Sequence, residues 1–323
     1  MTHMKMLLPV LFFLAVSAVR SNECFFTMEK NGFNAYHIEG AKITKSEYRS
    51  TEPILAFSGT KKGIAVAKGA PNASFEFRDW KQDFYVLTKV VIPDFAGIRK
   101  IAFSKDANHA AIAENKKTDC IISVYEKGNS NMLFRIEGNA LTDELLFSSD
   151  GRSLIAWHPR PEEKRYIIKA YDIPSGKLKI EAAVEVPMGY SGLWPLKISC
   201  DSINDGIYTE NTDEKFHKKY RRIDMTGHVS EISRENFLKR LGGMYIDGNT
   251  VYRMMDSRPE IVCRLDSFLD RENLVIKSAI SPQHKYVAVA TKRGYFFIDL
   301  KRKERISVSN KIFNDYFCWG GGN

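Results

Sequence analysis

A motif that recurs along the whole chain constrains the fold more than any other feature of the sequence. Each copy joins an apolar pair, a serine or another small residue, a short polar turn and a second apolar stretch, most clearly at Leu145–Trp157. Further copies begin at Leu55, Ile101, Leu196, Met244 and Ala279, and Tyr316–Gly320 resembles the first half of another. Because self-similarity at a regular interval is the signature of repeat architectures, one structural unit must recur.

A second motif follows each first one after about 20 residues, a spacing found within propeller blades. It is an alternating strand that ends in an acid before a turn, and its copies are Ser123–Glu126, Lys169–Asp172, Arg222–Asp224, Arg264–Asp266 and Phe297–Asp299. Period-two alternation between closely spaced turns indicates short antiparallel strands. One stretch, Ser233–Gly242, instead has a helical pattern with an N-cap and a terminal glycine.

Four short strands in each unit of about 44 residues are typical of a β-propeller blade. Blades stack around an axis because one blade alone cannot bury both of its faces, and the ring closes to hide its edges. We therefore predict an all-β chain, a single WD40-like β-propeller over residues 24–319 with about seven four-stranded blades and a short tail at 320–323. Six or eight blades stay open as alternatives, because the fourth and fifth units are weak copies.

Ring closure is predicted to use strands from both termini in one blade. The tail segment Ile312–Trp319 supplies the inner strand, and the other three strands are Cys24–Lys30, Phe33–Glu39 and Ala41–Tyr48.

The first residues and the cysteines favour different compartments. Residues 1–18 combine Lys5, an apolar stretch and small residues at Val16 and Ala18, which is typical of a secretory signal peptide and too short for a membrane span. The alternatives are a buried strand or a wrongly assigned start. Five cysteines without a CxxC pair are, by contrast, typical of buried thiols in a cytosolic protein. The sequence thus leaves cytoplasmic and secreted locations open.

Catalytic motifs are absent from the sequence. No two histidines have the i,i+4 spacing, and HExxH, G-x-S-x-G, Walker and GxGxxG patterns are all missing. We predict no enzymatic activity, no catalytic residue, no metal site and no cofactor. The acids that end the second motif are interpreted as turn caps that accept backbone hydrogen bonds, with a ring of ligands as the alternative.

Basic residues gather in two places. The first group is interleaved with Phe216 and Tyr220 and comprises Lys215, Lys218, Lys219, Arg221 and Arg222. The second comprises Lys292, Arg293, Lys301 and Arg302, followed by Lys303 and Arg305. Cations beside aromatic rings suit phosphate neutralisation and base stacking, so the two groups predict contact with RNA or the ribosome. The alternative is a solvated strand edge on which Lys and Arg prevent pairing with other sheets.

Several segments also resemble a known family. They are Leu146–Pro159, Ala170–Gly176, Gly192–Ser199, Ser278–Pro282, Gly294–Asp299 and Tyr316–Gly320. In this order they resemble the WD40-like propeller of eukaryotic translation initiation factor 2A and, less closely, that of the b subunit of initiation factor 3. The resemblance implies a cytoplasmic, non-enzymatic scaffold that binds the small ribosomal subunit, with tRNA or mRNA, during translation initiation. The alternative, from the leader at residues 1–18, is a secreted propeller whose loops bind a protein or glycan partner.

Overall fold

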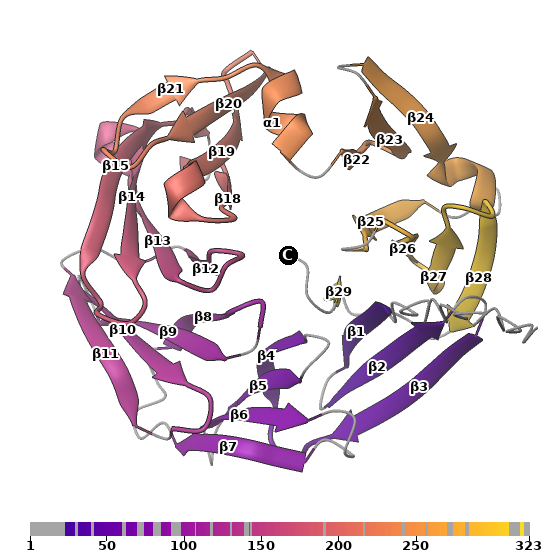
Figure 1. Ribbon diagram of the computed structural model, residues 1–323, viewed down its shortest axis with the longest axis horizontal. Helices are drawn as coiled ribbons and strands as arrows, with labels where there is room; N and C mark the ends of the chain where they lie inside the picture. Colours follow the sequence, from indigo (N-terminus) through magenta and orange to yellow (C-terminus); the bar gives the residue numbers. More distant parts are fainter. Residues whose placement is uncertain are drawn as a thin grey trace, which may run out of the picture.

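The chain folds into a ring of seven small antiparallel sheets, shown end-on in Figure 1. The computed structural model describes residues 23–29, 32–39, 42–59, 63–69, 74–79, 85–91, 98–106, 108–116, 119–129, 131–138, 142, 144–189, 192–215, 217–240, 243–255, 258–269, 274–281, 284–309 and 317–319. The predicted all-β propeller with seven blades is confirmed. No helix among these residues is long and apolar enough to cross a membrane.

The first four blades, each given from the innermost strand outward, have four strands. Blade 1 holds β29 (Phe317–Trp319), β1 (Glu23–Glu29), β2 (Gly32–Glu39) and β3 (Lys42–Arg49). Blade 2 holds β4 (Ile54–Gly59), β5 (Ile64–Lys68), β6 (Ser74–Asp79) and β7 (Tyr85–Val91). Blade 3 holds β8 (Ile98–Phe103), β9 (His109–Lys116), β10 (Asp119–Glu126) and β11 (Met132–Gly138). Blade 4 holds β12 (Glu144–Phe147), β13 (Ser153–Arg160), β14 (Arg165–Asp172) and β15 (Leu178–Glu185).

The remaining blades complete the ring. Blade 5 holds β18 (Lys197–Ser199), β19 (Ile207–Thr212), β20 (Lys218–Ile223) and β21 (Val229–Glu231). Blade 6 holds β22 (Met244–Asp247), β23 (Thr250–Met255) and β24 (Arg258–Arg264). Blade 7 holds β25 (Val275–Ile280), β26 (Tyr286–Thr291), β27 (Gly294–Asp299) and β28 (Glu304–Ser309). The connections include a ribbon of β16 (Met188–Gly189) and β17 (Gly192–Leu193), helix α1 (Arg234–Arg240), and the 3₁₀ turns η3 (Pro161–Glu163), η4 (Ile203–Asp205) and η5 (Leu265–Phe268).

Strands from both ends of the chain close the ring in blade 1. β29 pairs antiparallel with β1, with Phe25 opposite Trp319 and Thr27 opposite Phe317, and β1 continues to β2 and β3. The predicted closure is therefore confirmed. Phe25 is fully buried and meets Phe297 of blade 7 edge-on, with ring centroids 4.9 Å apart. Blade 1 thus packs against the blade that precedes it in the ring.

The recurring serine fastens the turn between the first two strands of a blade. In blade 4 the buried Ser148 hydroxyl donates to Asp150 (2.5 Å) and accepts the backbone N–H of Ser153 (3.0 Å). Ser104 bonds Asp106 and the N–H of His109 in the same way, and Ser281 accepts the N–H of Tyr286. Burial alone would raise the pKa of Asp150, but hydrogen bonds from Ser148 and the Arg152 amide lower it overall.

The acids at the ends of third strands cap the following turns. Asp224 accepts the backbone N–H groups of Thr226 (2.8 Å) and His228 (3.1 Å). Asp299 accepts those of Lys301 and Arg302. The capping interpretation is confirmed at these two positions.

Blade 6 differs from the other blades in having three described strands beside a helix. In blade 3 the turn after the third strand touches the outermost strand of the preceding blade, through the Gly128 N–H and the Thr88 hydroxyl (2.8 Å). In blade 7, Arg305 near the start of β28 donates to the carbonyl of Phe268, just beyond β24 (3.0 Å). Figure 1 shows β24 in the outermost place, in line with β21 and β28, so the innermost strand is the one that the described part of blade 6 lacks.

Helix α1 confirms the helical pattern of the sequence and fills the wedge between blades 5 and 6. The Ser233 hydroxyl accepts the Asn236 N–H and so caps its N-terminus. Phe237 and Leu238 are buried and pack with Tyr220 of blade 5 and Tyr245 of blade 6. The copy of the first motif at Met244 accordingly forms β22 and β23, and Arg264–Asp266 runs from the last strand into η5.

Cys120, Cys200 and Cys263 are buried free thiols, and Cys24 is also buried. Burial raises the pKa of the Cys200 thiol to about 12. The leader at residues 1–18, Phe216, the tail at 320–323 and the side chain of Cys318 lie outside the described residues.

Replacing Phe25 with alanine is expected to destabilise the ring strongly, because it removes a fully buried ring at the contact between blades 1 and 7. The free energy of unfolding in urea should fall by about 3–5 kcal/mol, the usual cost of a large aromatic-to-alanine change in a core. Leu178→Ala, at a residue that is 49% exposed, is the control and should change it by less than about 0.5 kcal/mol. Equal effects of the two changes would contradict a central role for this contact.

Candidate functional site

The hairpin turns of the blades open on two opposite faces of the ring. Consecutive strands are antiparallel, so the turn between the second and third strands and the turn between the third and fourth strands lie at opposite ends of a blade. We call the face with the former turns the upper face and the other the lower face. Lys215, Lys292 and Arg293 lie in upper-face turns, whereas Lys301 and Arg302 lie in a lower-face turn. The two predicted basic groups therefore do not form one surface.

The first basic group is also divided within β20. Successive side chains of a strand point to opposite faces of the sheet. Lys219 and Arg221 lie opposite Asn211 and Thr209 of β19, on the face that packs against blade 4. Lys218 and Arg222 lie on the other face, where the Lys218 ammonium is 3.8 Å from Asp247 of blade 6. The side chains of this run of cations therefore point into two different interfaces, one with blade 4 and one with blade 6.

Each of these strand residues also has a partner within the fold. Lys218 lies 3.4 Å from Glu210, and Lys219 lies 3.9 Å from Glu231. Arg221 donates to the Asn211 side-chain carbonyl (2.5 Å) and Arg222 to the Asp205 backbone carbonyl (3.1 Å). Part of their charge and hydrogen-bonding capacity is therefore used inside blade 5 and at its borders.

The second basic group is more exposed. Lys292 and Arg293 form the β26–β27 turn, and Lys301, Arg302 and Lys303 form the β27–β28 turn, all with exposed side chains. Within the part of the chain that the structure describes, Lys301–Lys303 have no ion pair with an acid. Whether either group contacts RNA stays a prediction.

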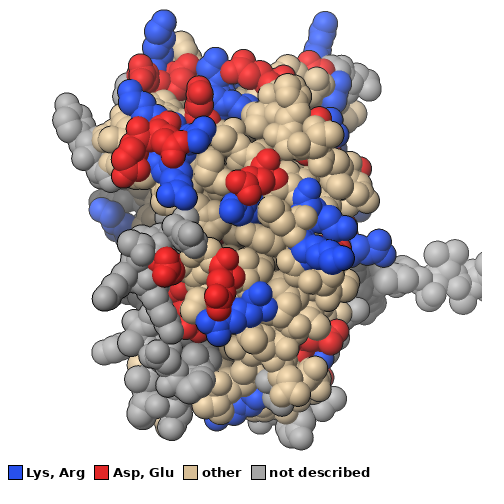
Figure 2. Space-filling model, turned by 90° about the vertical axis from the view of Figure 1, so that its left-hand side faces the viewer, with Lys and Arg blue, Asp and Glu red and all other residues tan. Residues whose placement is uncertain are grey.

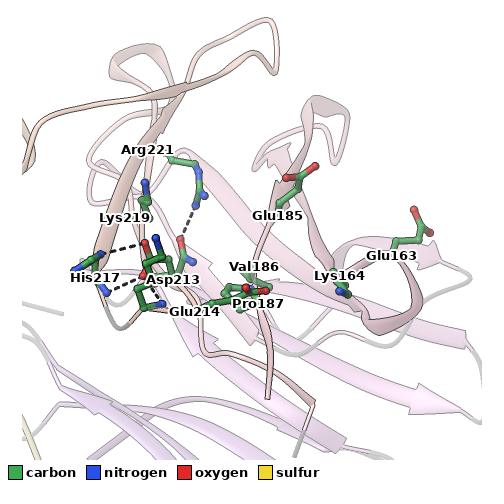
Figure 3. Close-up of a pocket in the computed structure, with 12 residues that line it drawn as sticks. Glu163, Lys164, Glu185, Val186, Pro187, Asp213, Glu214, His217, Lys219 and Arg221 are labelled. Atoms are coloured by element: carbon green, nitrogen blue, oxygen red, sulfur yellow. Dashed lines mark hydrogen bonds and ion pairs between the residues drawn. The ribbon is translucent and has the colours of Figure 1, made fainter. Parts of the chain in front are cut away.

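An open groove of about 770 Å³ lies on the upper face between blades 4 and 5 (Figure 3). On the blade 4 side it is lined by Glu163, Lys164, Glu185, Val186 and Pro187, and on the blade 5 side by Asn211, Asp213, Glu214, Lys215, His217, Lys219 and Arg221. Four of these residues are Lys or Arg and four are Asp or Glu. Val186 and Pro187 form an apolar step on the blade 4 side. This groove brings together Lys215, Lys219 and Arg221 of the first basic group and leaves Lys218 and Arg222 outside.

The turn Asp213–His217 forms one wall of the groove. The Asp213 carboxylate accepts the backbone N–H groups of His217 (2.8 Å) and Lys215 (2.9 Å), and the His217 ring lies 3.7 Å from its other oxygen. These bonds, above all that from the His217 amide, lower the pKa of Asp213. The ionised carboxylate therefore accepts hydrogen bonds within its own turn.

Polar side chains lie at and beneath the floor of the groove. Asn211 is 3% exposed and bonds Arg221, which is half-buried. Thr209 lies directly opposite Arg221 in the β19–β20 ladder, is completely buried, and has a hydroxyl oxygen without a hydrogen-bond partner. Thr209 does not itself line the groove, so Asn211 and Arg221 are the polar residues of the floor that a ligand can reach, and they make it a candidate binding surface.

The sequence did not reveal the wall from blade 4 or the floor. Glu163, Lys164 and Glu185 are unremarkable in the sequence and meet blade 5 only through the packing of two blades. A signal for the floor does exist in Ile207–Thr212, where Thr209 and Asn211 occupy the buried positions of an alternating strand. Polar residues at buried strand positions mark a departure from the apolar pattern of the repeat.

Acidic and basic side chains are also interspersed on the flank of the ring that carries blades 3 and 4 (Figure 2). Among the described residues, no three His, Cys, Asp or Glu side chains cluster in a way that could hold a metal ion.

Comparisons with known proteins identify the fold. No family model and no curated protein sequence matches the chain. A functionally unknown protein from Desulfotomaculum acetoxidans DSM 771 has a similar structure, with a TM-score of 0.60, 8% identity, and coverage of 92% of this chain and 98% of that one. The β-propeller domain of Myceliophteria thermophila Cps50 (Swd1) gives a TM-score of 0.50 with 11% identity, over 81% of this chain and 87% of that one. At these identities the likeness shows a WD40-like β-propeller fold alone.

The Asp213 carboxyl is expected to titrate below its ordinary value of 3.8, because backbone N–H groups stabilise the charged form. The turn bonds then stabilise the fold above that pH and are lost as the pH falls through the lowered pKa. A carbon-detected NMR titration measures the midpoint. His217→Ala keeps the backbone donor and should leave the midpoint below 3.8. A midpoint at or above 3.8 in the unmodified protein would contradict the assigned bonds.

Proposed function

We propose that this chain is a non-enzymatic binding scaffold whose upper-face groove between blades 4 and 5 holds an extended segment of a partner protein. The observation that supports it is the lining of the groove, in which a polar, half-buried floor and an apolar step at Val186–Pro187 stand among charges of both signs. Protein interfaces combine apolar contact with paired polar groups in this way.

The acids of the groove favour a protein over a nucleic acid as its ligand. Glu163, Glu185, Asp213 and Glu214 line it together with the cations. Binding of an RNA backbone depends on neutralising successive phosphates with a surface of one sign, and each nearby carboxylate opposes that. A polypeptide with both charges can complement both sets of residues.

The same lining supports a role without catalysis. No serine, threonine or cysteine is present among the described residues that line the groove. Its histidine, His217, is exposed and lies beside the acid that caps its own turn. An activated nucleophile would need a base within hydrogen-bond reach, and the groove offers no such pair.

Photo-crosslinking tests this function in cells. A photoreactive amino acid placed at Lys164 or Lys215, both exposed at the rim of the groove, should give a discrete protein adduct that mass spectrometry can identify. The same residue at Lys179, exposed on the outer strand β15, is the matched control and should not give that adduct.

Two outcomes would count against the protein-binding groove. Adducts of equal yield at Lys179 and Lys164 would mean that the contact is not local to the groove. Crosslinks to RNA in place of protein at Lys164 and Lys215 would assign the groove to a nucleic acid.

The lower-face turn supports a second candidate function, contact with RNA of the small ribosomal subunit during translation initiation, in the cytoplasm. Lys301, Arg302 and Lys303 are consecutive, exposed and without an ion pair among the described residues. Cations that project together from a turn can neutralise neighbouring phosphates. The resemblance of the repeat to the propeller of translation initiation factor 2A suggests the ribosome, with tRNA or mRNA, as the source of that RNA.

Reversing the charge of this turn tests the second function. Lys301→Glu with Arg302→Glu should abolish co-sedimentation with small ribosomal subunits at low salt, because two phosphate contacts become repulsive. Lys177→Glu with Lys179→Glu, exposed on blade 4, makes the same change in net charge and should retain binding. If both double variants lose co-sedimentation equally, binding depends on the overall charge of the chain and not on this turn.

The compartment in which the chain is found separates the ribosomal function from a secreted role. Ribosome contact requires the cytoplasm, whereas binding of a protein or glycan partner outside the cell requires that the leader at residues 1–18 acts as a signal. N-terminal sequencing of the mature chain distinguishes the two, because a cut after Ala18 would exclude the ribosomal function.

A further inference from the structure

A second cavity, of about 330 Å³, lies between blades 3 and 4, on the face of blade 4 opposite to the groove. Its walls come from β10 and β11 of blade 3 and from β13, β14 and β15 of blade 4. The volume lies at the lower end of the range for small-molecule sites, about 300–1,000 Å³. The cavity therefore has room for a small molecule rather than for a polypeptide segment.

Three isoleucines give this cavity an apolar lining. Ile122 and Ile136 lie opposite each other in the β10–β11 ladder of blade 3, and Ile167 contributes from β14 of blade 4. Ile122 also belongs to the buried core that the two blades share. An apolar ligand in the cavity would cover side-chain surface that the packing of the blades leaves open, which favours binding.

Arg160 leaves one positive charge unbalanced at the cavity. The other charged side chains that line it have partners, because Lys169 lies 3.4 Å from Glu181, and Glu137 lies 3.0 Å from Arg135. Arg160 is half-buried at the end of β13 and, within the described residues, forms neither an ion pair nor a hydrogen bond. A guanidinium has five N–H donors, so a partly desolvated one is stabilised by an anion that brings acceptor oxygens.

Tyr171 provides an independent observation at the same cavity. It pairs with Leu154 and so lies six positions from Arg160 along the β13–β14 ladder. It lines the cavity, is only 6% exposed, and its hydroxyl has no hydrogen-bond partner in the described part of the chain. Burial raises the pKa of Tyr171 to about 12, so this hydroxyl keeps its proton at neutral pH and can donate a hydrogen bond. A buried hydroxyl without a partner costs stability, and an acceptor on a ligand would remove that cost.

We propose that this cavity binds a small aromatic carboxylic acid with a hydrogen-bond acceptor at the end opposite to its carboxylate. The carboxylate pairs with Arg160, because the planar fork of a guanidinium matches two carboxylate oxygens. The Tyr171 hydroxyl donates to the distant acceptor, and the flat ring lies between the two facing sheets against the isoleucines. A phosphate group would bring more negative charge towards Glu137 and Glu181.

4-Hydroxyphenylacetate is the probe, and isothermal titration calorimetry with the full chain measures its affinity. Tyrosol, in which an alcohol replaces the carboxylate, is the matched control ligand. It should bind about tenfold more weakly or worse, because the charge-assisted pair with Arg160 is lost. Equal affinities of the two ligands, or no binding of the probe, would overturn the inference.

Substitutions of Arg160 test the carboxylate contact from the side of the protein. Arg160→Gln should weaken the probe about tenfold or more, and Arg160→Lys, which keeps the charge but not the fork, should retain part of the affinity. Arg152→Gln removes the same charge from an exposed residue just before β13 and should leave the affinity within about twofold. Equal losses in the two glutamine variants would overturn the contact, since binding would then follow overall charge.

Tyr171→Phe tests the other end of the ligand. It removes the hydroxyl and keeps the ring, so it should weaken 4-hydroxyphenylacetate about threefold and leave phenylacetate, which lacks the phenol oxygen, unchanged. The urea midpoint should not fall, because the hydroxyl has no partner to lose among the described residues. An equal change in the affinities of the two ligands would contradict the Tyr171 contact.

Filling the cavity locates the ligand. Ile136→Phe places a larger ring in the β11 wall and should abolish binding of the probe, whereas the Lys164 crosslink in the groove should persist. Undiminished affinity in this variant would place the ligand elsewhere and overturn the inference. If inorganic phosphate binds through Arg160 more tightly than the probe, the cavity is a phosphate site and the inference also fails. None of these outcomes bears on the protein-binding function, which depends on the other face of blade 4.

Discussion

The antiparallel pairing of β29 with β1 is the constraint on which the rest of the structure depends. It gives blade 1 its inner strand and joins the two ends of the chain, so that Phe25 is held against blade 7. In a closed ring each blade is fixed by two neighbours, and no blade can move without opening a buried interface. The groove between blades 4 and 5 therefore has a defined width even though its two walls share no sheet.

Much of this architecture could be predicted from the sequence because its causes are local. A serine such as Ser148 closes a turn through bonds that span five residues, and Asp224 or Asp299 caps a turn within four. The meeting of the chain ends followed from the need of a propeller to hide its edges. Blade 6 departed from the pattern because α1 takes up the chain that would have formed an inner strand, and that exchange depends on the aromatic packing of Tyr220, Phe237 and Tyr245.

The candidate site was less predictable, since a run of cations in the sequence does not specify a surface. Lys218 to Arg222 lie in a strand, where alternation sends neighbours to opposite faces and so divides the charge between two interfaces. Lys301 to Lys303 lie in a turn, and a turn projects its side chains from one end of a blade. The blade 4 wall had no sequence signal at all, because Lys164 and Glu185 acquire their role only when two blades pack together.

One of the two weak copies of the repeat, blade 5, forms a wall of the candidate site. Blade 4, the clearest copy, fills its second strand with Leu154, Ile155 and Ala156, all fully buried. Blade 5 places Thr209 and Asn211 at buried positions of the equivalent strand, beside the half-buried Arg221. A core that served packing alone would be more stable with apolar residues there. Local rules of sequence and structure are commonly broken where a protein binds a ligand. The proposed binding function therefore explains both the weak repeat pattern of blade 5 and the polar residues of its groove.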